Sequence, residues 1–271
     1  KDVKKLQKHK IMIFEGVNGN KMEKGQQEFY GGLHIFDLGS TGKSYETLEK
    51  MKIDTVTLGS ISKEMIFGVV ITKNKDEVVS DTKKNEKYKP FLEGKDIGNY
   101  QINFANKFLL YEKSKLHRSR TPEIFETKEK LLVQRISGGT KPLKVAYDNQ
   151  QYYNKESINN IIIGDKKYDP KYILTLLNSN LINWYYSSKF TNASKLTVNV
   201  SKAYLSQIPI KPISINEQKP LIDNANNILN LKGDKTEIIR KFKDRISQNL
   251  ELKKFTKKLV NFHELIFEEF F

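Results

Sequence analysis

Short apolar runs recur along the middle of the chain, and polar or glycine-containing residues close each of them. The clearest runs are residues 107–113 (KFLLYEK), 130–136 (KLLVQRI), 144–148 (KVAYD), 151–153 (QYY) and 160–163 (NIII). Runs this short at this spacing are typical of β-strands joined by turns. The pattern therefore predicts a largely antiparallel sheet. Two further strands are expected between Ile53 and Val79, where Gly68 and the polar residues 73–76 interrupt the apolar sequence.

Helices are expected to flank this sheet. The Thr121-Pro122-Glu123 stretch has the residue types that cap and start a helix, which we expect to continue to about residue 130. Asp169-Pro170 opens a longer helix with apolar residues at steps of three to four. Its apolar stripe consists of Tyr172, Ile173, Leu176, Leu177, Leu181 and Trp184. At this spacing the aromatic residues 184–186 are expected in the core rather than on a base-stacking surface.

The C-terminal part is expected to be different. Residues 202–212 (KAYLSQIPIKP) predict an extended segment bounded by proline. The apolar spacing beyond it predicts one helix with Pro220 in its first turn and a second helix capped by Asp234, with an apolar seam that continues to Ile266. The predicted fold class is therefore α+β, a largely antiparallel sheet with flanking helices over residues 53–212. Residues 213–271 would form a C-terminal helical segment, and residues 1–52 a lead-in or linker from an upstream domain.

Positive charge is the first indication of function. The chain has 47 Lys and Arg residues against 32 Asp and Glu, which gives a formal net charge of +15. This balance favours a polyanionic partner, either nucleic acid or an acidic membrane surface. A chain rich in Lys, Asn and Ile is also what an AT-rich genome encodes, so charge alone leaves an ordinary basic surface as the alternative. The 13 tyrosines and the clustered arginines favour nucleic acid.

Several kinds of site are excluded or unsupported. The chain has no cysteine, which excludes disulfides, thiolate catalysis and cysteine-ligated zinc. The four histidines show no metal-ligand spacing, so no metal site is expected. No segment has the roughly eighteen consecutive apolar residues of a membrane-spanning helix, and no secretory signal opens the sequence. We expect a cytoplasmic protein without a membrane partner and, because the first residue is Lys1, a part of a longer chain.

One glycine loop resembles a nucleotide-binding motif. Residues 33–44 (LHIFDLGSTGKS) end in Gly-Lys-Ser, but the glycine that a P-loop needs five residues before this Gly-Lys pair is replaced by Asp37. The string at residues 37–41 resembles the first phosphate loop of actin-like ATPases, but that fold needs a second loop and an adenosine motif. We favour a strand, a turn and a helix over residues 45–51 capped by Ser44. A nucleotide-dependent enzyme stays as an alternative.

The order of several motifs is similar to that of a known family. In chain order they are PFLEGKDIGNY (90–100), LLYEKSKLHRSRTPEIF (109–125), KLLVQRIS (130–137), Tyr152-Tyr153, YILTLLNSNLINWY (172–185) and YLSQIPIKP (204–212). Together they resemble the TaqI-like C-terminal specificity domain of adenine-specific DNA methyltransferases and of fused type IIG restriction-modification enzymes. The resemblance covers roughly residues 53–212. The tail (KKFTKKLVNFHELIFEEF) resembles the helical end of the Eco57I-like branch.

The resemblance implies that residues 53–212 are a DNA target-recognition domain. In the full enzyme this domain is joined to a catalytic domain that binds S-adenosylmethionine and carries an Asn-Pro-Pro-Tyr or Asn-Pro-Pro-Phe motif for N6-adenine methylation. That motif is absent from this sequence, and no nuclease cluster of carboxylates and lysine stands out. We therefore assign no catalytic residue and no cofactor to this chain. The implied partners are double-stranded DNA and a fused or separate methyltransferase domain, with or without a fused endonuclease.

Arg135 and Gln134 follow a predicted buried strand directly. Arginine can pair bidentately with guanine and glutamine with adenine, so both side chains have the chemistry of base readout. However, alternate residues of a strand share a face, so Arg135 would lie on the face of Leu131 and Val133. There it would pair with a carboxylate such as Asp148 or Glu126. The structural role and the DNA-contact role are both left open.

The other candidate contacts are basic and polar residues between the predicted elements. Clustered Lys and Arg can hold phosphate oxygens without a unique geometry, whereas bases should be read by loops such as residues 72–76, 137–141 and 191–194. The candidate DNA-binding residues are Lys113, Lys115, Arg118, Arg120, Gln134, Arg135, Ser137, Lys141, Lys166, Lys167, Lys189, Asn192 and Lys195. A second alternative is a protein-interaction or specificity subunit that docks a separate methyltransferase through its C-terminal helices.

Overall fold

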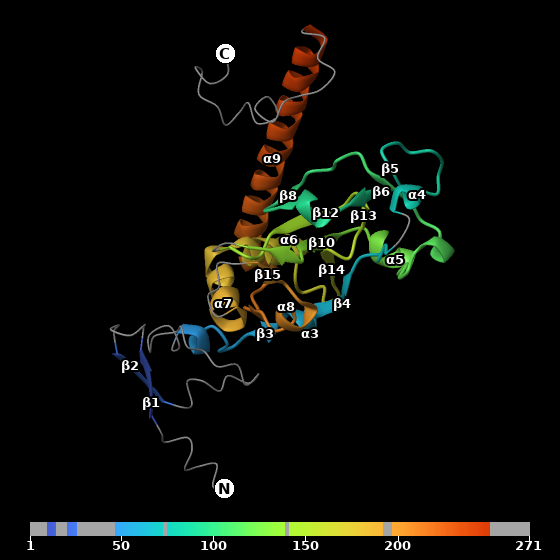
Figure 1. The fold of residues 1–271 in the computed structure, drawn as a ribbon. Coiled ribbons are helices and arrows are strands. Elements are labelled where there is room, and N and C mark those ends of the chain that lie inside the picture. The colour runs from blue at the N-terminus through green and yellow to red at the C-terminus, as the bar shows by residue number, and fades with distance from the viewer. Residues whose placement is uncertain are drawn as a thin grey trace.

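The structure is a computed structural model of the chain (Figure 1). It describes residues 47–72, 75–138, 141–191 and 197–249, together with the backbone of a hairpin formed by β1 (Lys10–Phe14) and β2 (Lys21–Gly25). The two hairpin strands pair antiparallel, with Lys10 opposite Gly25. The glycine loop at residues 33–44 and the end of the predicted C-terminal seam at residues 250–271 lie outside the described residues.

A four-stranded antiparallel sheet forms the centre of the fold. Its order is β12 (Val145–Asp148), β10 (Lys130–Gln134), β14 (Ile158–Ile163) and β4 (Ser62–Phe67). Both faces of β10 are buried, because Leu131 and Val133 belong to one apolar cluster and Leu132 to another. This explains why the apolar run is continuous rather than alternating. The predicted mixture of helices and a largely antiparallel sheet is confirmed.

A second sheet and several short pairs complete the β-structure. The second sheet has the order β13 (Tyr153–Asn154), β6 (Tyr88–Leu92), β9 (Phe108–Leu110) and β5 (Val79–Ser80), and only its β13–β6 pair is parallel. The remaining pairs are β7 (Ile97–Gly98) with β8 (Gln101–Ile102), β11 (Ile136–Ser137) with β15 (Val198–Asn199), and β16 (Pro209–Ile210) with β3 (Val56–Thr57). The short helical turns are α3 (Leu58–Ile61), α4 (Lys75–Val78), η2 (Gly94–Asp96), η3 (Lys113–Lys115), α5 (Pro122–Phe125) and α8 (Lys202–Leu205).

A buried ion pair joins the two strands at one side of the central sheet. Lys130 lies opposite Asp148 in the β10–β12 register, and its Nζ is 2.6 Å from Oδ2 of Asp148, with both side chains fully buried. Nζ also donates to the carbonyl oxygen of Phe125 at 2.5 Å. Burial lowers the pKa of Lys130 from its usual value, and Asp148 acts against that effect. Both charges therefore have the partners that a dry environment requires.

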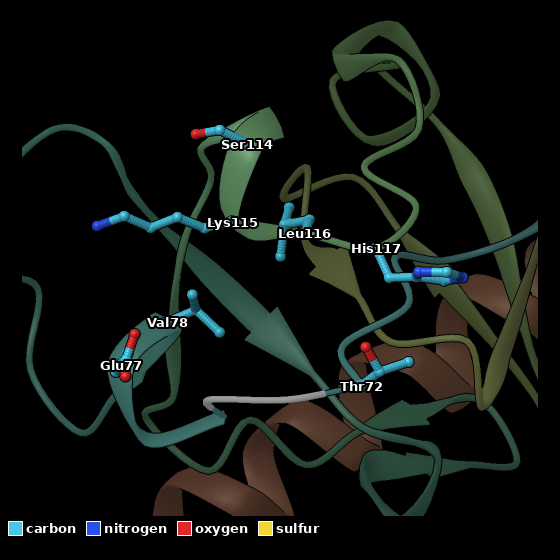
Figure 2. A pocket seen from close by; sticks show the side chains of 7 residues that line it. All are labelled: Thr72, Glu77, Val78, Ser114, Lys115, Leu116 and His117. Carbon is cyan, nitrogen blue, oxygen red and sulfur yellow. The ribbon is translucent and has the colours of Figure 1, made fainter.

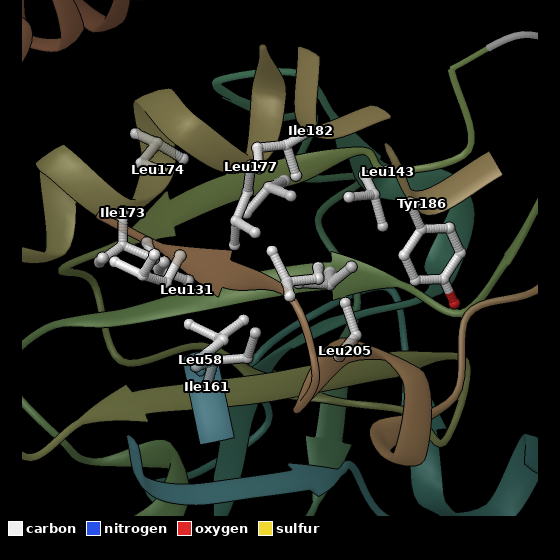
Figure 3. Packing of buried hydrophobic residues seen from close by; sticks show 14 of the residues in the cluster. Leu58, Leu131, Leu143, Ile161, Ile173, Leu174, Leu177, Ile182, Tyr186 and Leu205 are labelled. Atoms are coloured by element: carbon white, nitrogen blue, oxygen red, sulfur yellow. The ribbon is translucent and has the colours of Figure 1, made fainter. Parts of the chain in front are cut away.

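Two helices cover one face of the central sheet. These are α6 (Pro170–Asn178) and α7 (Asn180–Phe190), and Figure 3 shows Ile173 of α6 beside Leu131 of the sheet and Tyr186 of α7 beside Leu143, all in one apolar cluster. The predicted start of α6 is confirmed, because the Asp169 side chain accepts from the N–H of Lys171.

The prediction of one continuous helix over this region is wrong. Ser179 has an extended backbone and caps α7 by accepting from the N–H of Ile182, so the chain turns between the two helices. As a result Leu181, which the stripe placed in the core, is 55% exposed. The prediction for the aromatic residues is confirmed: Tyr185 and Tyr186 are buried, and Trp184 packs against the same cluster.

The C-terminal helix differs most from its prediction. A single helix, α9 (Ile215–Asn249), has 35 residues and runs through Asp234, which therefore caps no second helix. Its first half packs on α6 and buries Gln218 and Ala225, and Figure 1 shows its second half extending away from the sheets. Pro220 lies inside the helix, five residues after its first residue.

Three smaller predictions need correction. The segment before Gly68 holds α3 as well as strands, because Thr57 caps a helical turn by accepting from the N–H of Ser60. Residues 202–212 are not wholly extended, since Ser201 caps α8. The helix after Thr121 ends at Phe125 rather than near residue 130, and the Thr121 side chain makes no capping hydrogen bond.

Candidate nucleic-acid interface

Three strands of the central sheet reach the same edge. In the antiparallel register Gln134 lies opposite Ile158, and Asn159 lies opposite Phe67. The ends of β10 and β4 therefore meet at the start of β14. Phe67 lies two residues after Met65, and Arg135 lies two residues after Val133. Because Met65 and Val133 belong to the same apolar cluster, the Phe67 ring lies on the same side of the sheet as Arg135.

Close backbone packing brings a second segment to this edge. A Cβ added to Gly68 would lie 2.0 Å from the carbonyl oxygen of Asn154, so no larger residue fits at this position. Beyond Gly68 the chain forms an isolated antiparallel bridge between Val70 and Arg118. The bridge carries Arg118 and Arg120 to the end of β4. We call Phe67, Arg118, Arg120 and Arg135 the arginine edge.

Arg120 is fixed by its backbone and by its side chain. Its φ of 62° is in the left-handed region, which costs a non-glycine residue about 1 kcal/mol. The hydroxyl of Tyr111 donates to the Arg120 carbonyl oxygen at 2.5 Å, and Nε of Arg120 donates to the carbonyl oxygen of Phe67 at 3.0 Å. Its guanidinium carbon lies 4.1 Å from the centroid of the Phe67 ring. Burial, and next the charge of Arg118, lower the pKa of Arg120 from its usual value.

Arg135 contacts the same ring from the other strand. Its guanidinium carbon is 5.0 Å from the Phe67 centroid, and Nη1 donates to the carbonyl oxygen of Glu156 at 2.8 Å. The predicted carboxylate partners are wrong. Asp148 is paired with Lys130, and Glu126 accepts a hydrogen bond of 2.8 Å from the hydroxyl of Tyr153. Arg135 therefore has a structural role, but its side chain is bound to one carbonyl oxygen and to the Phe67 ring rather than to a negative charge.

Within the described residues the arginines of the arginine edge form no salt bridge, although the charge of Glu64 acts on Arg120. In the described ranges no carboxylate lies within salt-bridge distance of Arg118, Arg120 or Arg135. Arg120 uses one of its five N–H donors on Phe67, and Arg135 uses one side-chain donor on Glu156. Like charges held close together repel each other. An anion bound here would relieve that repulsion and accept hydrogen bonds from the remaining N–H groups.

Two of the predicted polar contacts point inward. The Ser137 side chain is buried and its hydroxyl donates to the carbonyl oxygen of Pro142. Oε1 of Gln134 is also buried, and it has no hydrogen-bond partner in the structure. A buried amide oxygen without a partner is costly. Neither oxygen is presented to solvent as a base-reading group.

The predicted lysines fall into separate groups. Lys113 and Lys115 are exposed on η3, and Lys115 lies 3.5 Å from Glu112. Exposed Lys141 precedes β12, whose first residue lies at the arginine edge. By contrast, exposed Lys166 and Lys167 follow the last residue of β14, at the opposite edge of the sheet. Lys189 lies near the end of α7, and Asn192 and Lys195 lie outside the described residues.

A shallow recess of about 320 Å³ lies between residues 114–117 and the segment that contains Thr72 and Val78 (Figure 2). Leu116 separates Lys115 from His117 along one wall, and their side chains point in different directions. Val78 and Thr72 line the recess from the other segment.

The described part of the chain contains no group of three or more His, Cys, Asp or Glu side chains that could hold a metal ion. None of its helices is both long and apolar enough to span a membrane.

The sequence did not indicate two exposed residues on a neighbouring ribbon. In the β11–β15 pair Ile136 lies opposite Asn199 and both are exposed, whereas Ser137 and Val198 are buried. Phe67 was also missed. Nothing in its spacing distinguishes it from the other apolar residues of β4. An alternation of exposed and buried residues over two positions is too short to be recognised before the pairing is known.

Comparison with known proteins finds a similar family for the middle of the chain. The profile of the TaqI-like C-terminal specificity domain matches residues 89–210. This segment, a little under half of the chain, is therefore similar to that family. The specificity domain is followed by a match to a domain of unknown function, DUF8810, over residues 214–271. The boundary between the two matches falls at the start of α9.

A relative from Methanocaldococcus jannaschii is named as a type II restriction enzyme and methyltransferase. It is 26% identical over 171 residues, which cover 62% of this chain and 14% of the relative. The chain thus spans about one seventh of the length of that relative.

Two solved structures are similar to the chain at low identity. They are the type IIL restriction-modification enzyme MmeI in complex with DNA (TM-score 0.48, 12% identity, 83% of this chain and 34% of that chain) and a type I restriction-modification S subunit from M. genitalium (0.43, 16%, 72% and 45%).

Proposed function

We propose that this chain is the DNA target-recognition module of a restriction-modification enzyme. The observation that carries the proposal is the match of residues 89–210 to a specificity domain. The net charge of +15 and the arginine edge, which forms no salt bridge in the described residues, support it independently. A polyanion such as duplex DNA is the ligand that this charge distribution favours.

The module holds DNA mainly through phosphates at the arginine edge. Arg118 is exposed, and Arg120 and Arg135 present guanidinium groups that are already fixed on Phe67. Fixed guanidinium groups lose little entropy when they bind an anion bidentately. Lys113, Lys115 and Lys141 extend the same surface, whereas Lys166 and Lys167 at the opposite edge contribute only through long-range attraction.

The catalytic partner belongs to the rest of a longer protein or to a separate subunit. The M. jannaschii relative supports a methyltransferase parent, and we propose an N6-adenine methyltransferase that uses S-adenosylmethionine. We keep residues 53–212 as the target-recognition domain and residues 213–271 as a C-terminal helical segment. The docking-subunit alternative is not favoured, because the family match lies in the specificity domain itself.

A binding titration tests this proposal. A fluorescently labelled duplex of random sequence is titrated with the protein at several salt concentrations. The expected result is tight binding at low salt and a linear fall of log K with log salt, at about 0.9 per phosphate contact. If no binding occurs at low salt, the chain is not a DNA-binding module.

A further inference from the structure

The ribbon formed by β11 and β15 presents one polar and one apolar side chain side by side. Ile136 and Asn199 are directly opposite each other, so their side chains share a face with Cβ atoms about 5 Å apart. Both are exposed, and Ile136 is 58% exposed. Among the large apolar residues exposed in the described ranges, it is the one that lies on a strand.

The opposite face of the ribbon anchors it to the core. Ser137 and Val198 are buried there. The N–H of Val200 donates to the carbonyl oxygen of Arg135 at 2.7 Å, and Nδ2 of Asn159 donates to the carbonyl oxygen of Val200 at 2.8 Å. The residue after Asn199 is thus hydrogen-bonded to the residue before Ile136 and to β14 of the central sheet. This anchoring limits the movement of Ile136 and Asn199, which favours direct readout.

The position of the ribbon indicates which ligand would cover it. Arg135, a member of the arginine edge, immediately precedes Ile136 in the chain. A DNA backbone bound by the arginine edge would therefore bring base edges to the ribbon next to it. A two-stranded antiparallel ribbon is narrow enough to enter the major groove.

The two side chains match one kind of base pair. In the major groove adenine offers N7 as an acceptor and its N6 amino group as a donor, which an asparagine amide can bind bidentately. Thymine offers a C5 methyl group, which favours an apolar contact such as isoleucine. An A·T pair, or two adjacent A·T pairs, presents both features together.

We propose that Asn199 and Ile136 are specificity-determining residues, in which Asn199 reads adenine and Ile136 contacts a thymine methyl group. This inference rests on the proposed DNA-recognition function. It assigns sequence reading to the ribbon, and it leaves the arginine edge with the sequence-independent phosphate contacts.

The test combines protein variants with modified DNA. Wild type, Asn199→Ala and Ile136→Ala are each used to select binding sites from a random-duplex pool. The matched controls are Asn180→Ala and Leu181→Ala, which remove the same kinds of exposed side chain from α7. Wild-type protein is also titrated with its enriched site after adenine is replaced by 7-deazaadenine, which lacks N7, or thymine by uracil, which lacks the methyl group.

The expected result is position-specific. Asn199→Ala should remove the preference for adenine at one position, with a loss of about tenfold to 100-fold in affinity for the enriched site. The 7-deazaadenine duplex should weaken wild type but have little further effect on Asn199→Ala. The uracil duplex should weaken binding by wild type but have little further effect on binding by Ile136→Ala. The two α7 control variants should select the wild-type motif.

Two results would overturn the inference and have different meanings. If wild type enriches a motif and both ribbon variants enrich the same motif unchanged, the ribbon does not read DNA, and the proposed function stands. If wild type binds duplex DNA without enriching any motif, target recognition by this chain fails, and the role of the ribbon fails with it.

Discussion

Arg120 and Phe67 make two contacts at once: Nε of Arg120 donates to the Phe67 carbonyl oxygen at 3.0 Å, and its guanidinium carbon lies 4.1 Å from the centroid of the Phe67 ring. The ring is shared with Arg135, at 5.0 Å. One aromatic side chain at the end of β4 therefore orients two cations from different parts of the chain. Cation–π contacts of this kind keep a guanidinium in place without neutralising it.

The first prediction separates charge from position at the arginine edge. Arg118→Ala should weaken binding to all duplex sequences and reduce the salt slope by about one, with little change in stability, because Arg118 is exposed. Arg120→Ala should have the same effect on binding and also lower the free energy of unfolding by about 1 kcal/mol, since it loses the contact with Phe67. Salt-dependent titrations and urea denaturation measure the two effects.

Arg240→Ala is the matched control for this pair. Arg240 is an exposed arginine on α9 that pairs with Glu237 and Asp244 at 2.8 and 2.7 Å. The salt slope should not change in this variant. A slope that is also unchanged in the Arg118→Ala and Arg120→Ala double variant would remove both residues from the phosphate contacts.

The second prediction concerns the buried pair of β10 and β12. Lys130→Met leaves the Asp148 carboxylate buried without its cation, and Asp148→Asn leaves the Lys130 ammonium without its anion. Each variant should lose about 3–5 kcal/mol in the free energy of unfolding. The double variant Lys130→Met with Asp148→Asn should be less destabilised than the sum of the two single effects. Urea denaturation tests this, and strictly additive losses would show that the two charges are not coupled.

The short strands could be predicted because residues close to each strand in the sequence mark its boundaries. β9, β12 and β14 each follow a polar or turn-forming stretch, and Asp169-Pro170 marks the start of α6 by cap chemistry alone. What the sequence could not show is where helical periodicity stops. The apolar steps of three to four residues continue across Ser179, although its side chain caps a new helix there.

The prediction of a helix break at Asp234 was wrong in the opposite sense, because here the sequence indicates a helix end that the structure does not have. Gly233-Asp234 is a good local signal for a helix end and a new cap, but α9 passes through it, and just beyond it Thr236 accepts a hydrogen bond from Gln101 of β8 at 3.2 Å. The arginine edge could be predicted in part, since Arg118, Arg120 and Arg135 were chosen for their chemistry. Their common neighbour Phe67 and the exposed Asn199 depend on strand register, which the local sequence does not determine.

The third prediction uses the continuous helix. A Cβ added at Gly233 meets no atom within 4 Å, so Gly233→Ala can be accommodated without strain. Alanine should stabilise α9 by up to about 1 kcal/mol, because glycine is the weaker helix former. Circular dichroism at increasing temperature should show helix signal retained to a higher temperature. A loss of helix signal in this variant would indicate that the helix ends at Gly233.

The fourth prediction is a pH dependence that comes from buried tyrosines. Burial, and next the neighbouring Tyr168, raise the pKa of Tyr172 to about 12, and burial followed by the charge of Glu49 raises that of Tyr185 to about 12. A raised pKa in the folded state means that the folded protein holds the proton longer than the unfolded chain. The stability that these residues contribute is therefore complete below pH 10, the ordinary value, and is lost as the pH rises towards 12.

Denaturation at two pH values measures this effect. The urea midpoint should be lower at about pH 11 than at about pH 9, and Tyr172→Phe should reduce the difference. The hydroxyl of Tyr172 donates to the carbonyl oxygen of Lys211 at 2.7 Å, so the variant will also lose some stability at both pH values. A midpoint that does not change over this range in wild type would contradict the assignment.

Selection from a random-duplex pool tests the central claim most directly. The wild-type chain is used to enrich duplexes at low salt and again near physiological salt, and binding of the enriched and scrambled sequences is then compared. We predict that one short motif is enriched and keeps its advantage as salt rises, because base contacts depend less on salt than phosphate contacts do. Binding without enrichment that disappears with salt would contradict target recognition by these residues.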